Sequence, residues 1–333
     1  MNKFILKKLF NLEAFNEYLK AAQETNQFTN YGMAVQYLEQ RARRMLKIDD
    51  SKAVIATNNG STALHAIIYA MSRQDEKAYR VSTQDFTFPC NSQGPASGPI
   101  VVDIDHNLQI DLNDQYLSQY SDMVIVTNCF GHLQNLDYIV ENTINKGKKL
   151  IFDNAATPYS FWNGTNSCNL GNASFISLHH TKPIGFGEGG LVIIDKEYEE
   201  SVRIACNFGL VNGAFNERAG NFKMSELAAA GVLQWWDSFN SDIEVIQKQY
   251  LNNYYKELYA LRDIDCSTFL HQAGEDEIFF PNCLPLIHKE PVNVNAYPDM
   301  DVRKYYYPLR GFANSQYVYD RIICFPITRG ING

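Results

Sequence analysis

One lysine of the sequence stands in a segment that favours covalent chemistry. Lys182 closes the polar segment 177–182 and precedes the glycine-rich segment 185–190, with strand-like apolar runs on both sides. A lysine that forms a Schiff base with an aldehyde must be uncharged when it attacks, and burial on a short turn at a strand end lowers its pKa. The segment therefore indicates a Schiff-base lysine. A solvated lysine beside an ordinary glycine-rich turn fits the same pattern.

A carboxylate upstream supports the first interpretation. Asp153 ends the apolar run Lys149–Asp153, which reads as a buried strand. A buried carboxylate without a cationic partner is costly, and the protonated pyridine nitrogen of pyridoxal 5'-phosphate is such a partner. The alternative is an aspartate that caps the next segment.

A third element, the segment Asn58–Thr62, has the composition of a phosphate-binding turn. It follows the apolar run Val54–Ala56 and precedes a helical stripe of apolar residues. A strand, a glycine-containing turn and a helix direct free backbone N–H groups at a phosphate. A helix that is merely capped by Ser or Thr has the same composition and needs no ligand.

Several motifs in one order resemble the DegT family of pyridoxal-phosphate-dependent sugar aminotransferases, within the fold type I superfamily. The segments that carry the resemblance are Thr29–Gly32, Asn59–Leu64, Phe86–Phe88, Val102–Asp105, Asn128–Gly131, Asp153–Ala156, the Lys182 segment and Gly220–Leu227. Two positions depart from the family pattern. Ala156 stands where many relatives have Gln or His near the cofactor's phenolic oxygen, and Phe130 stands where Tyr is common. The closing amphipathic helix that relatives usually carry is missing after Thr328.

The resemblance implies roles for particular residues. Lys182 would form the Schiff base with the cofactor, and Asp153 would pair with its pyridinium nitrogen. The residues that match positions around the ring and the phosphate of the cofactor are Phe88, over the ring, and Gly60, Ser61 and Ser177, at the phosphate. Asn221 matches an asparagine that reaches the phosphate from the neighbouring subunit, which implies a homodimer with shared active sites.

The substrate contacts are expected from two segments. Relatives carry an aromatic-Pro-Leu element similar to Tyr305–Leu309, so Tyr306 and Tyr307 are expected at the substrate, although an aromatic surface or core cluster is equally compatible. His179 lies beside the lysine in sequence and is expected to contact substrate as an acid or base, with a neutral structural histidine as the alternative.

Composition excludes several classes of protein. The 333 residues carry a formal net charge of −8, so nucleic acid and anionic membranes are not expected partners. The basic cluster Arg41–Arg44 is expected on a solvated helix face. The seven cysteines lack zinc-ligand spacing, which predicts no metal site and reduced thiols in a cytoplasmic protein. Cys90 is expected as a small buried filler or at the edge of the cofactor pocket. No apolar run reaches roughly 18 residues, so neither export nor a membrane span is expected.

The apolar runs predict an α/β fold. Seven short strands alternate with helical stripes, which gives a mostly parallel seven-stranded sheet flanked by helices, with ligands at the carboxyl ends of the strands. The runs are 54–57, 79–83, 100–103, 123–127, 149–153, 174–178 and 191–194. We expect residues 1–240 to form a large cofactor-binding domain with an N-terminal helical segment, and residues 241–333 a small C-terminal α+β domain.

The resemblance to the DegT family implies the activity. The expected reaction converts a nucleotide-linked keto-deoxysugar to an amino sugar for surface polysaccharide or natural-product biosynthesis, with glutamate as the expected amino donor and pyridoxamine 5'-phosphate as the intermediate form of the cofactor. One alternative is a sugar dehydratase that uses the same cofactor, in which His replaces the lysine. Another is a non-catalytic sensor that has kept the fold.

Overall fold

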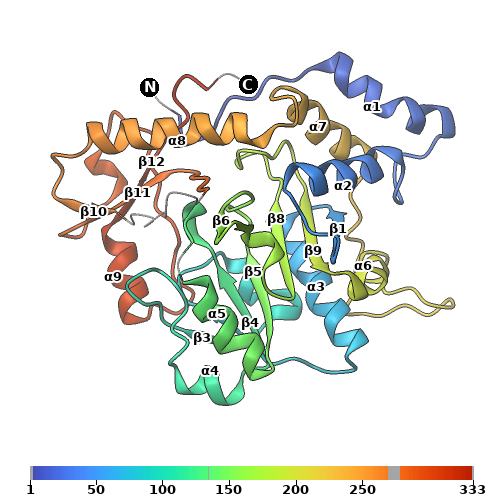
Figure 1. Ribbon diagram of the computed structural model, residues 1–333, viewed down its shortest axis with the longest axis horizontal. Helices are drawn as coiled ribbons and strands as arrows, with labels where there is room; N and C mark the ends of the chain where they lie inside the picture. Colours follow the sequence, from blue (N-terminus) through green and yellow to red (C-terminus); the bar gives the residue numbers. More distant parts are fainter. Residues whose placement is uncertain (1–2, 134, 269–277, 332–333) are drawn as a thin grey trace.

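The computed structural model describes residues 3–133, 135–268 and 278–331, and a seven-stranded sheet lies at its centre (Figure 1). The strand order is β1-β9-β8-β5-β4-β2-β3, and β9 runs antiparallel to β1 and β8 while the other neighbours are parallel. The strands are β1 (Lys52–Thr57), β2 (Val81–Gln84), β3 (Ile100–Val102), β4 (Met123–Thr127), β5 (Lys149–Asp153), β8 (Ala173–Ser177) and β9 (Gly190–Asp195). The predicted mostly parallel sheet of seven strands is confirmed.

Both faces of this sheet are covered, because successive side chains of its inner strands point to opposite faces and most of them are apolar. On β9, Leu191 and Ile193 pack into one hydrophobic cluster while Val192 and Ile194 pack into another. One face is covered by α3 (Gly60–Gln74) and α6 (Glu199–Cys206). The other is covered by α2 (Met33–Met45), α7 (Glu226–Asp237) and α8 (Ile243–Ala260), and further along by α4 (Gln115–Tyr120) and α5 (Leu136–Thr143). The N-terminal helix α1 (Leu12–Thr25) packs on α7.

The C-terminal part adds a second, smaller sheet. Its strand order is β10-β11-β12, all antiparallel, with α9 beside it (Figure 1). The elements are β10 (Cys266–Thr268), β11 (Leu284–His288), α9 (Ala313–Arg321) and β12 (Ile322–Phe325), and a short hairpin of β6 (Phe161–Trp162) and β7 (Thr165–Asn166) belongs to the preceding part.

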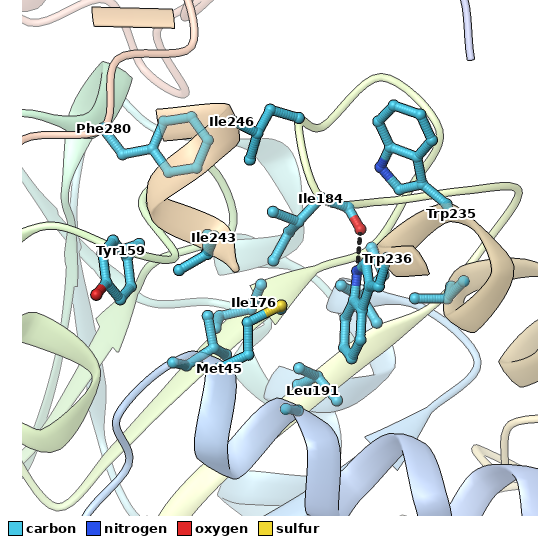
Figure 2. Close-up of a cluster of buried hydrophobic side chains, with 14 of the residues drawn as sticks. Met45, Tyr159, Ile176, Ile184, Leu191, Trp235, Trp236, Ile243, Ile246 and Phe280 are labelled. Carbon is cyan, nitrogen blue, oxygen red and sulfur yellow. Dashed lines mark hydrogen bonds between the residues drawn. The ribbon is translucent and has the colours of Figure 1, made fainter. Parts of the chain in front are cut away.

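The division near residue 240 stays a prediction. Residues from both sides of it share one hydrophobic core, in which Trp236 and Ile176 lie with Ile243 and Phe280 (Figure 2). The boundaries 1–240 and 241–333 also include residues 1–2, 134, 269–277 and 332–333, which lie outside the described residues.

The basic cluster Arg41–Arg44 does not form a solvated face, so that expectation was wrong for Arg41. Its side chain is buried, with the residue 8% exposed. The guanidinium donates to Asp237 Oδ1 at 2.6 Å and to the Tyr18 hydroxyl at 2.7 Å. Arg44, in contrast, is exposed. The two arginines differ in exposure because of their positions on α2. Arg41 lies on the face that packs against α1 and α7.

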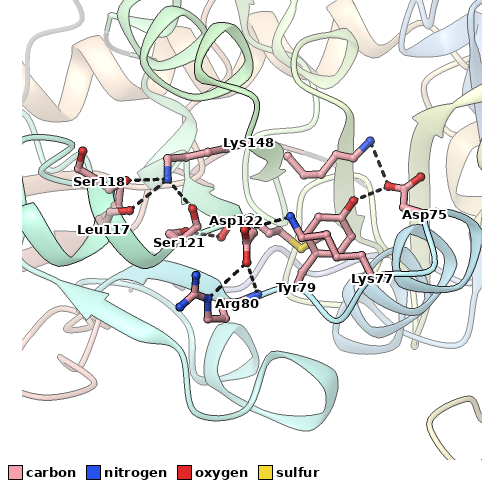
Figure 3. A network of polar contacts seen from close by, with 11 residues as sticks. Asp75, Lys77, Tyr79, Arg80, Leu117, Ser118, Ser121, Asp122 and Lys148 are labelled. Atoms are coloured by element: carbon pink, nitrogen blue, oxygen red, sulfur yellow. Dashed lines mark hydrogen bonds and ion pairs between the residues drawn. The ribbon is translucent and has the colours of Figure 1, made fainter.

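The two ends of the sheet carry different polar groups. At the amino ends of the strands, Asp122 pairs with Lys77 at 3.0 Å and with Arg80 at 3.5 Å, and Lys148 donates to three carbonyls around it (Figure 3). These groups satisfy one another. The carboxyl ends carry Asp153 and Ser177, which face a cavity. In the described part of the chain, no helix has both the length and the apolar character needed to cross a bilayer.

Candidate active site

A cavity of about 690 Å³ lies at the carboxyl ends of the strands. Eight of the residues expected at the site line it: Gly60, Ser61, Phe88, Asp153, Ser177, His179, Lys182 and Tyr306. Two expected residues, Tyr307 and Asn221, are not among the lining residues of this chain. The cavity therefore brings together the lysine, the aspartate and the glycine-serine turn, as parallel sheets do with the residues that follow their strands.

Asp153 ends β5 and is 2% exposed. Its Oδ2 accepts hydrogen bonds from Asn91 Nδ2 at 3.0 Å and from Thr127 Oγ1 at 3.4 Å, and its Oδ1 accepts from the Ala155 amide at 3.0 Å. Burial raises the pKa of Asp153, and these donors and the charge of Lys182 act in the opposite direction.

The three hydrogen-bond donors to Asp153 are neutral, so they fix its orientation without neutralising its charge. The protonated ring nitrogen of pyridoxal phosphate would supply the missing cation. The aspartate thus fits the pyridinium of this cofactor, and its bond from the Ala155 amide also caps the following turn, as in the alternative interpretation.

Lys182 lies on the turn between β8 and β9. The Lys182 amide donates to His179 O at 2.8 Å, and the Gly185 amide donates to Lys182 O at 3.0 Å. Gly185 is required here because a Cβ at this position would lie 2.2 Å from His179 O. Burial lowers the pKa of Lys182, while the charge of Asp153 raises it to a smaller extent. A turn of this shape holds an amine that is able to act as nucleophile and base.

A cradle for a phosphate lies where α3 begins beside the end of β8. Asn59 caps the helix by accepting from the Thr62 amide at 2.9 Å, so the cap is Asn59 and not the Ser or Thr of the alternative interpretation. Thr62 is engaged in this capping box, and Ser61 and Ser177 line the cavity beside it. A Cβ at Gly60 would lie 3.2 Å from Ser177 Cβ, a tight contact, so glycine favours the close approach of the two segments. Two hydroxyls and the first amides of the helix fit a phosphate dianion.

The remaining walls are largely aromatic. Phe88 is 51% exposed at the cavity, and Cys90 is both buried and part of the lining. Tyr306 stacks on Phe130 with ring centres 5.4 Å apart and meets Phe86 edge-on at 5.5 Å. Tyr307 is 73% exposed and packs on Tyr319 outside the cavity, which fits the surface alternative for that residue.

Charged groups of the lining lie on two segments far apart in sequence. His179 Nε2 is 3.5 Å from Glu188 Oε1, and its Nδ1 is 2.8 Å from Thr181 Oγ1. Arg303 contributes a guanidinium that pairs with Asp301 at 3.1 Å and lies 5.7 Å from the centre of the Phe4 ring. These groups surround the space in which a sugar and an amino acid would be recognised.

The segment that carries the Tyr306 wall is attached to the sheet through the start of α9. Asp85 Oδ2 accepts from the Phe312 amide at 2.8 Å and from Ser315 Oγ at 2.7 Å. Asp103 accepts from the amides of Asn314 at 2.8 Å and Ser315 at 3.0 Å. Burial acts to raise the pKa of Asp103, but these donors hold it below its usual value. Two carboxylates that follow β2 and β3 thus cap α9.

Sequence patterns missed several residues at the site. No pattern singles out Asn91, which lies outside the cavity lining and donates to Asp153. Asn282 lines the cavity opposite the altered position Ala156, whose carbonyl accepts from Asn282 Nδ2 at 3.4 Å. Phe4 and Arg303 come from the two ends of the described chain. No spacing in the sequence links these residues to Lys182, so only the proximity of Asn91 to Phe88 gave a signal.

The strand order is that of the fold type I aminotransferases, and the lysine turn and the buried aspartate fit the pyridoxal phosphate that this class uses. The model of the DegT/DnrJ/EryC1/StrS aminotransferase family matches residues 11–282, and the chain belongs to this family. The protein is therefore a pyridoxal-phosphate-dependent sugar aminotransferase.

Two curated relatives carry names that describe enzymes of nucleotide-sugar metabolism. The chain is 26% identical to a dTDP-4-amino-4,6-dideoxy-D-glucose transaminase of Shigella dysenteriae, over 90% of this chain and 82% of the relative. It is 27% identical to a GDP-perosamine synthase of Caulobacter vibrioides, over 54% of this chain and 50% of that relative.

Solved structures share the fold. PseC of Helicobacter pylori, an aminotransferase involved in the biosynthesis of pseudoaminic acid, superposes with a TM-score of 0.79 at 15% identity, over 98% of this chain and 94% of that chain. DesI in the presence of its TDP-sugar product superposes with a TM-score of 0.77 at 19% identity, over 98% and 91% of the two chains.

Proposed function

We propose that the protein transfers an amino group from an amino acid, with glutamate as the first donor to test, to the keto group of a nucleotide-linked deoxysugar. The amino sugar would serve surface polysaccharide or natural-product biosynthesis. The observation that carries this proposal is the placement of Lys182 and Asp153 in one cavity beside a phosphate cradle. The seven cysteines are free thiols, which supports a reducing, cytoplasmic location.

Five residues of the cavity have a part in the proposed reaction. Pyridoxal phosphate, when bound, would supply the electron sink and carry the amino group from donor to acceptor. Asp153 keeps a proton on the ring nitrogen. Lys182 Nζ removes the proton from the donor's α-carbon and later delivers a proton to the sugar carbon that receives nitrogen. Ser61, Ser177 and the first amides of α3 anchor the phosphate, and Phe88 covers the ring.

The first prediction tests the half-reaction with the donor. Protein loaded with pyridoxal phosphate should show the visible absorbance of a lysine-bound cofactor, and glutamate should bleach it as the pyridoxamine form accumulates. Stopped-flow absorbance measures the rate, and a D-amino acid is the matched control. Recovery of the visible absorbance on addition of a dTDP-linked or GDP-linked keto-sugar supports the proposed transfer. A spectrum that does not respond to any amino donor contradicts it and favours the dehydratase or sensor alternatives.

The proposal includes a homodimer with shared sites. Asn221 is exposed, and its backbone carbonyl accepts from Asn58 Nδ2 at 3.2 Å, beside the phosphate cradle but outside the cavity of its own chain. The adjoining segment 207–220 projects from the body (Figure 1) and exposes apolar side chains, of which Phe215 is 76% exposed. An exposed apolar segment next to Asn221 is suited to pack on a second copy, which would carry Asn221 to the partner's phosphate.

Subunit complementation provides the second prediction. Lys182→Ala and Asn221→Ala homodimers should each be impaired, because one lacks the amine and the other lacks a charge-assisted hydrogen bond of about 1.5–3 kcal/mol to the phosphate. A heterodimer of the two carries one site with both lesions and one with neither, so mixing should restore activity to a fraction of the parent level. Native mass spectrometry verifies subunit exchange. Verified heterodimers without recovery would show that Asn221 serves its own subunit or does not reach the phosphate.

A further inference from the structure

The turn that carries Lys182 is held from outside through its carbonyl oxygens. Trp236 Nε1 donates to Ile184 O at 2.7 Å (Figure 2), and Trp235 Nε1 donates to Pro183 O at 3.0 Å. Both tryptophans are buried on α7. Two consecutive carbonyls of the turn are thus bound by two consecutive residues of one helix.

Lys8 binds three more carbonyls of the same turn. Its Nζ donates to His180 O at 2.7 Å, to Lys182 O at 2.6 Å and to Gly185 O. The ammonium also lies 5.3 Å from the centre of the Trp235 ring. An ammonium has three N–H groups, so each of them has one carbonyl partner.

The charge at this position is buried. Lys8 is 9% exposed, and burial lowers its pKa to about 7. The three carbonyl dipoles and the indole face act in the opposite direction, because they stabilise the charged form. Without the lysine, the carbonyls of His180 and Gly185 would lose the donor that Lys8 provides in a buried place.

The segment around Lys8 is also part of the cavity. Phe4 and Ile5 line it, while Leu6 is buried in the main hydrophobic core. The Phe4 amide donates to Asp301 Oδ2 at 3.1 Å, which fixes the far end of the segment. The segment 3–8 therefore runs from the cavity wall to the underside of the lysine turn.

We infer that Lys8 is a positioning residue for Lys182, because it binds the backbone carbonyl of the very residue whose amine must reach the reacting carbon. This inference rests on the proposed role of Lys182. Loss of the three hydrogen bonds from Lys8 Nζ would let the peptide planes at 180–185 tilt. A displacement of about 1 Å at the backbone is enough to lower a rate roughly 100-fold when proton transfer depends on alignment.

The test compares Lys8→Met with Lys7→Met. Lys7 is the exposed neighbour, so its replacement changes the net charge equally without touching the turn. In cofactor-free protein, hydrogen exchange followed by mass spectrometry should show the amides of the segment 178–187 exchanging about 10-fold faster in Lys8→Met, with the parent rate in Lys7→Met. In loaded protein, kcat should fall about 10- to 100-fold with KM nearly unchanged.

Several outcomes would overturn the inference. If the amides of segment 178–187 exchange at equal rates in the two variants, Lys8 does not hold the turn. If they exchange faster in Lys8→Met but kcat is unchanged, the role of Lys8 is purely structural. If Lys8→Met does not fold, Lys8→Gln is the second variant, because it retains two N–H donors without the charge. Its amide exchange and its kcat should lie between those of the parent and those expected for Lys8→Met. Parent values of both in Lys8→Gln would also overturn the inference. Failure of the proposed function is separate, because it appears in the parent protein as absorbance that does not respond to amino donors.

Discussion

Replacing Lys182 by alanine should abolish amino transfer and leave the fold intact. The amine is held on a turn by backbone and tryptophan hydrogen bonds that the substitution does not touch. It would act both as the covalent attachment of the cofactor and as the base, so we expect kcat/KM to fall on the order of 10⁴-fold or more. The visible absorbance of lysine-bound cofactor should vanish, while thermal unfolding should stay close to that of the parent.

Lys196→Ala is the matched control for this variant. Lys196 is an exposed lysine that follows β9, and its loss should change neither absorbance nor rate. A small primary amine in solution should restore part of the rate to Lys182→Ala, because the substitution leaves room for it in the cavity. Turnover by Lys182→Ala close to the parent rate, without added amine, would assign the chemistry to another residue.

Replacing Asp153 by asparagine should cost activity far more than stability. An amide is unable to hold a proton on the ring nitrogen, so we expect kcat to fall about 10²- to 10⁴-fold. The amide would also turn a donor toward Asn91 Nδ2 or toward the Ala155 amide, which both donate to the carboxylate now. This mismatch should lower the free energy of unfolding by about 1–3 kcal/mol, partly offset because a buried charge is removed.

Asp122→Asn controls for the loss of one carboxylate. Asp122 lies in the ion-pair network at the opposite ends of the strands (Figure 3), so its replacement should leave kcat at the parent value. Cofactor content is measured by absorbance after denaturation. Near-parent kcat in Asp153→Asn with a full complement of cofactor would rule out the pyridinium role.

The sheet and the placement of Asp153 and Lys182 at one cavity were predictable because each depends on local pattern. Buried parallel strands need continuous apolar runs, and the residue that ends such a run must lie at the edge of the sheet. Asp153 is the last residue of β5, and Lys182 follows β8 on a turn that glycine makes possible. The cap of α3 was not predictable from composition, because Asn59 competes with Ser61 and Thr62 for the same role and the sequence does not rank them.

The outer wall of the cavity was not predictable in this way. Phe4, Asn282 and Arg303 approach Lys182 only through tertiary packing. The sequence does not distinguish the three tyrosines of Tyr305–Tyr307. In the structure, Tyr306 packs on Phe130 in the cavity wall, whereas Tyr307 packs on Tyr319 outside it. The burial of Arg41 was not predictable for the same reason. A basic cluster on a helix is typical of a solvated face, and only the packing of α7 places Asp237 beside Arg41.

The capping of α9 by Asp85 and Asp103 has a consequence for how substrates come and go. Swinging the Tyr306 wall away from the sheet would break the five hydrogen bonds that these carboxylates accept from Phe312, Asn314 and Ser315. At about 1 kcal/mol each, the opened state would be populated by roughly one molecule in five thousand. A substrate would therefore enter the cavity through an opening of nearly fixed width, and its affinity would not be reduced by the free energy of closing a lid.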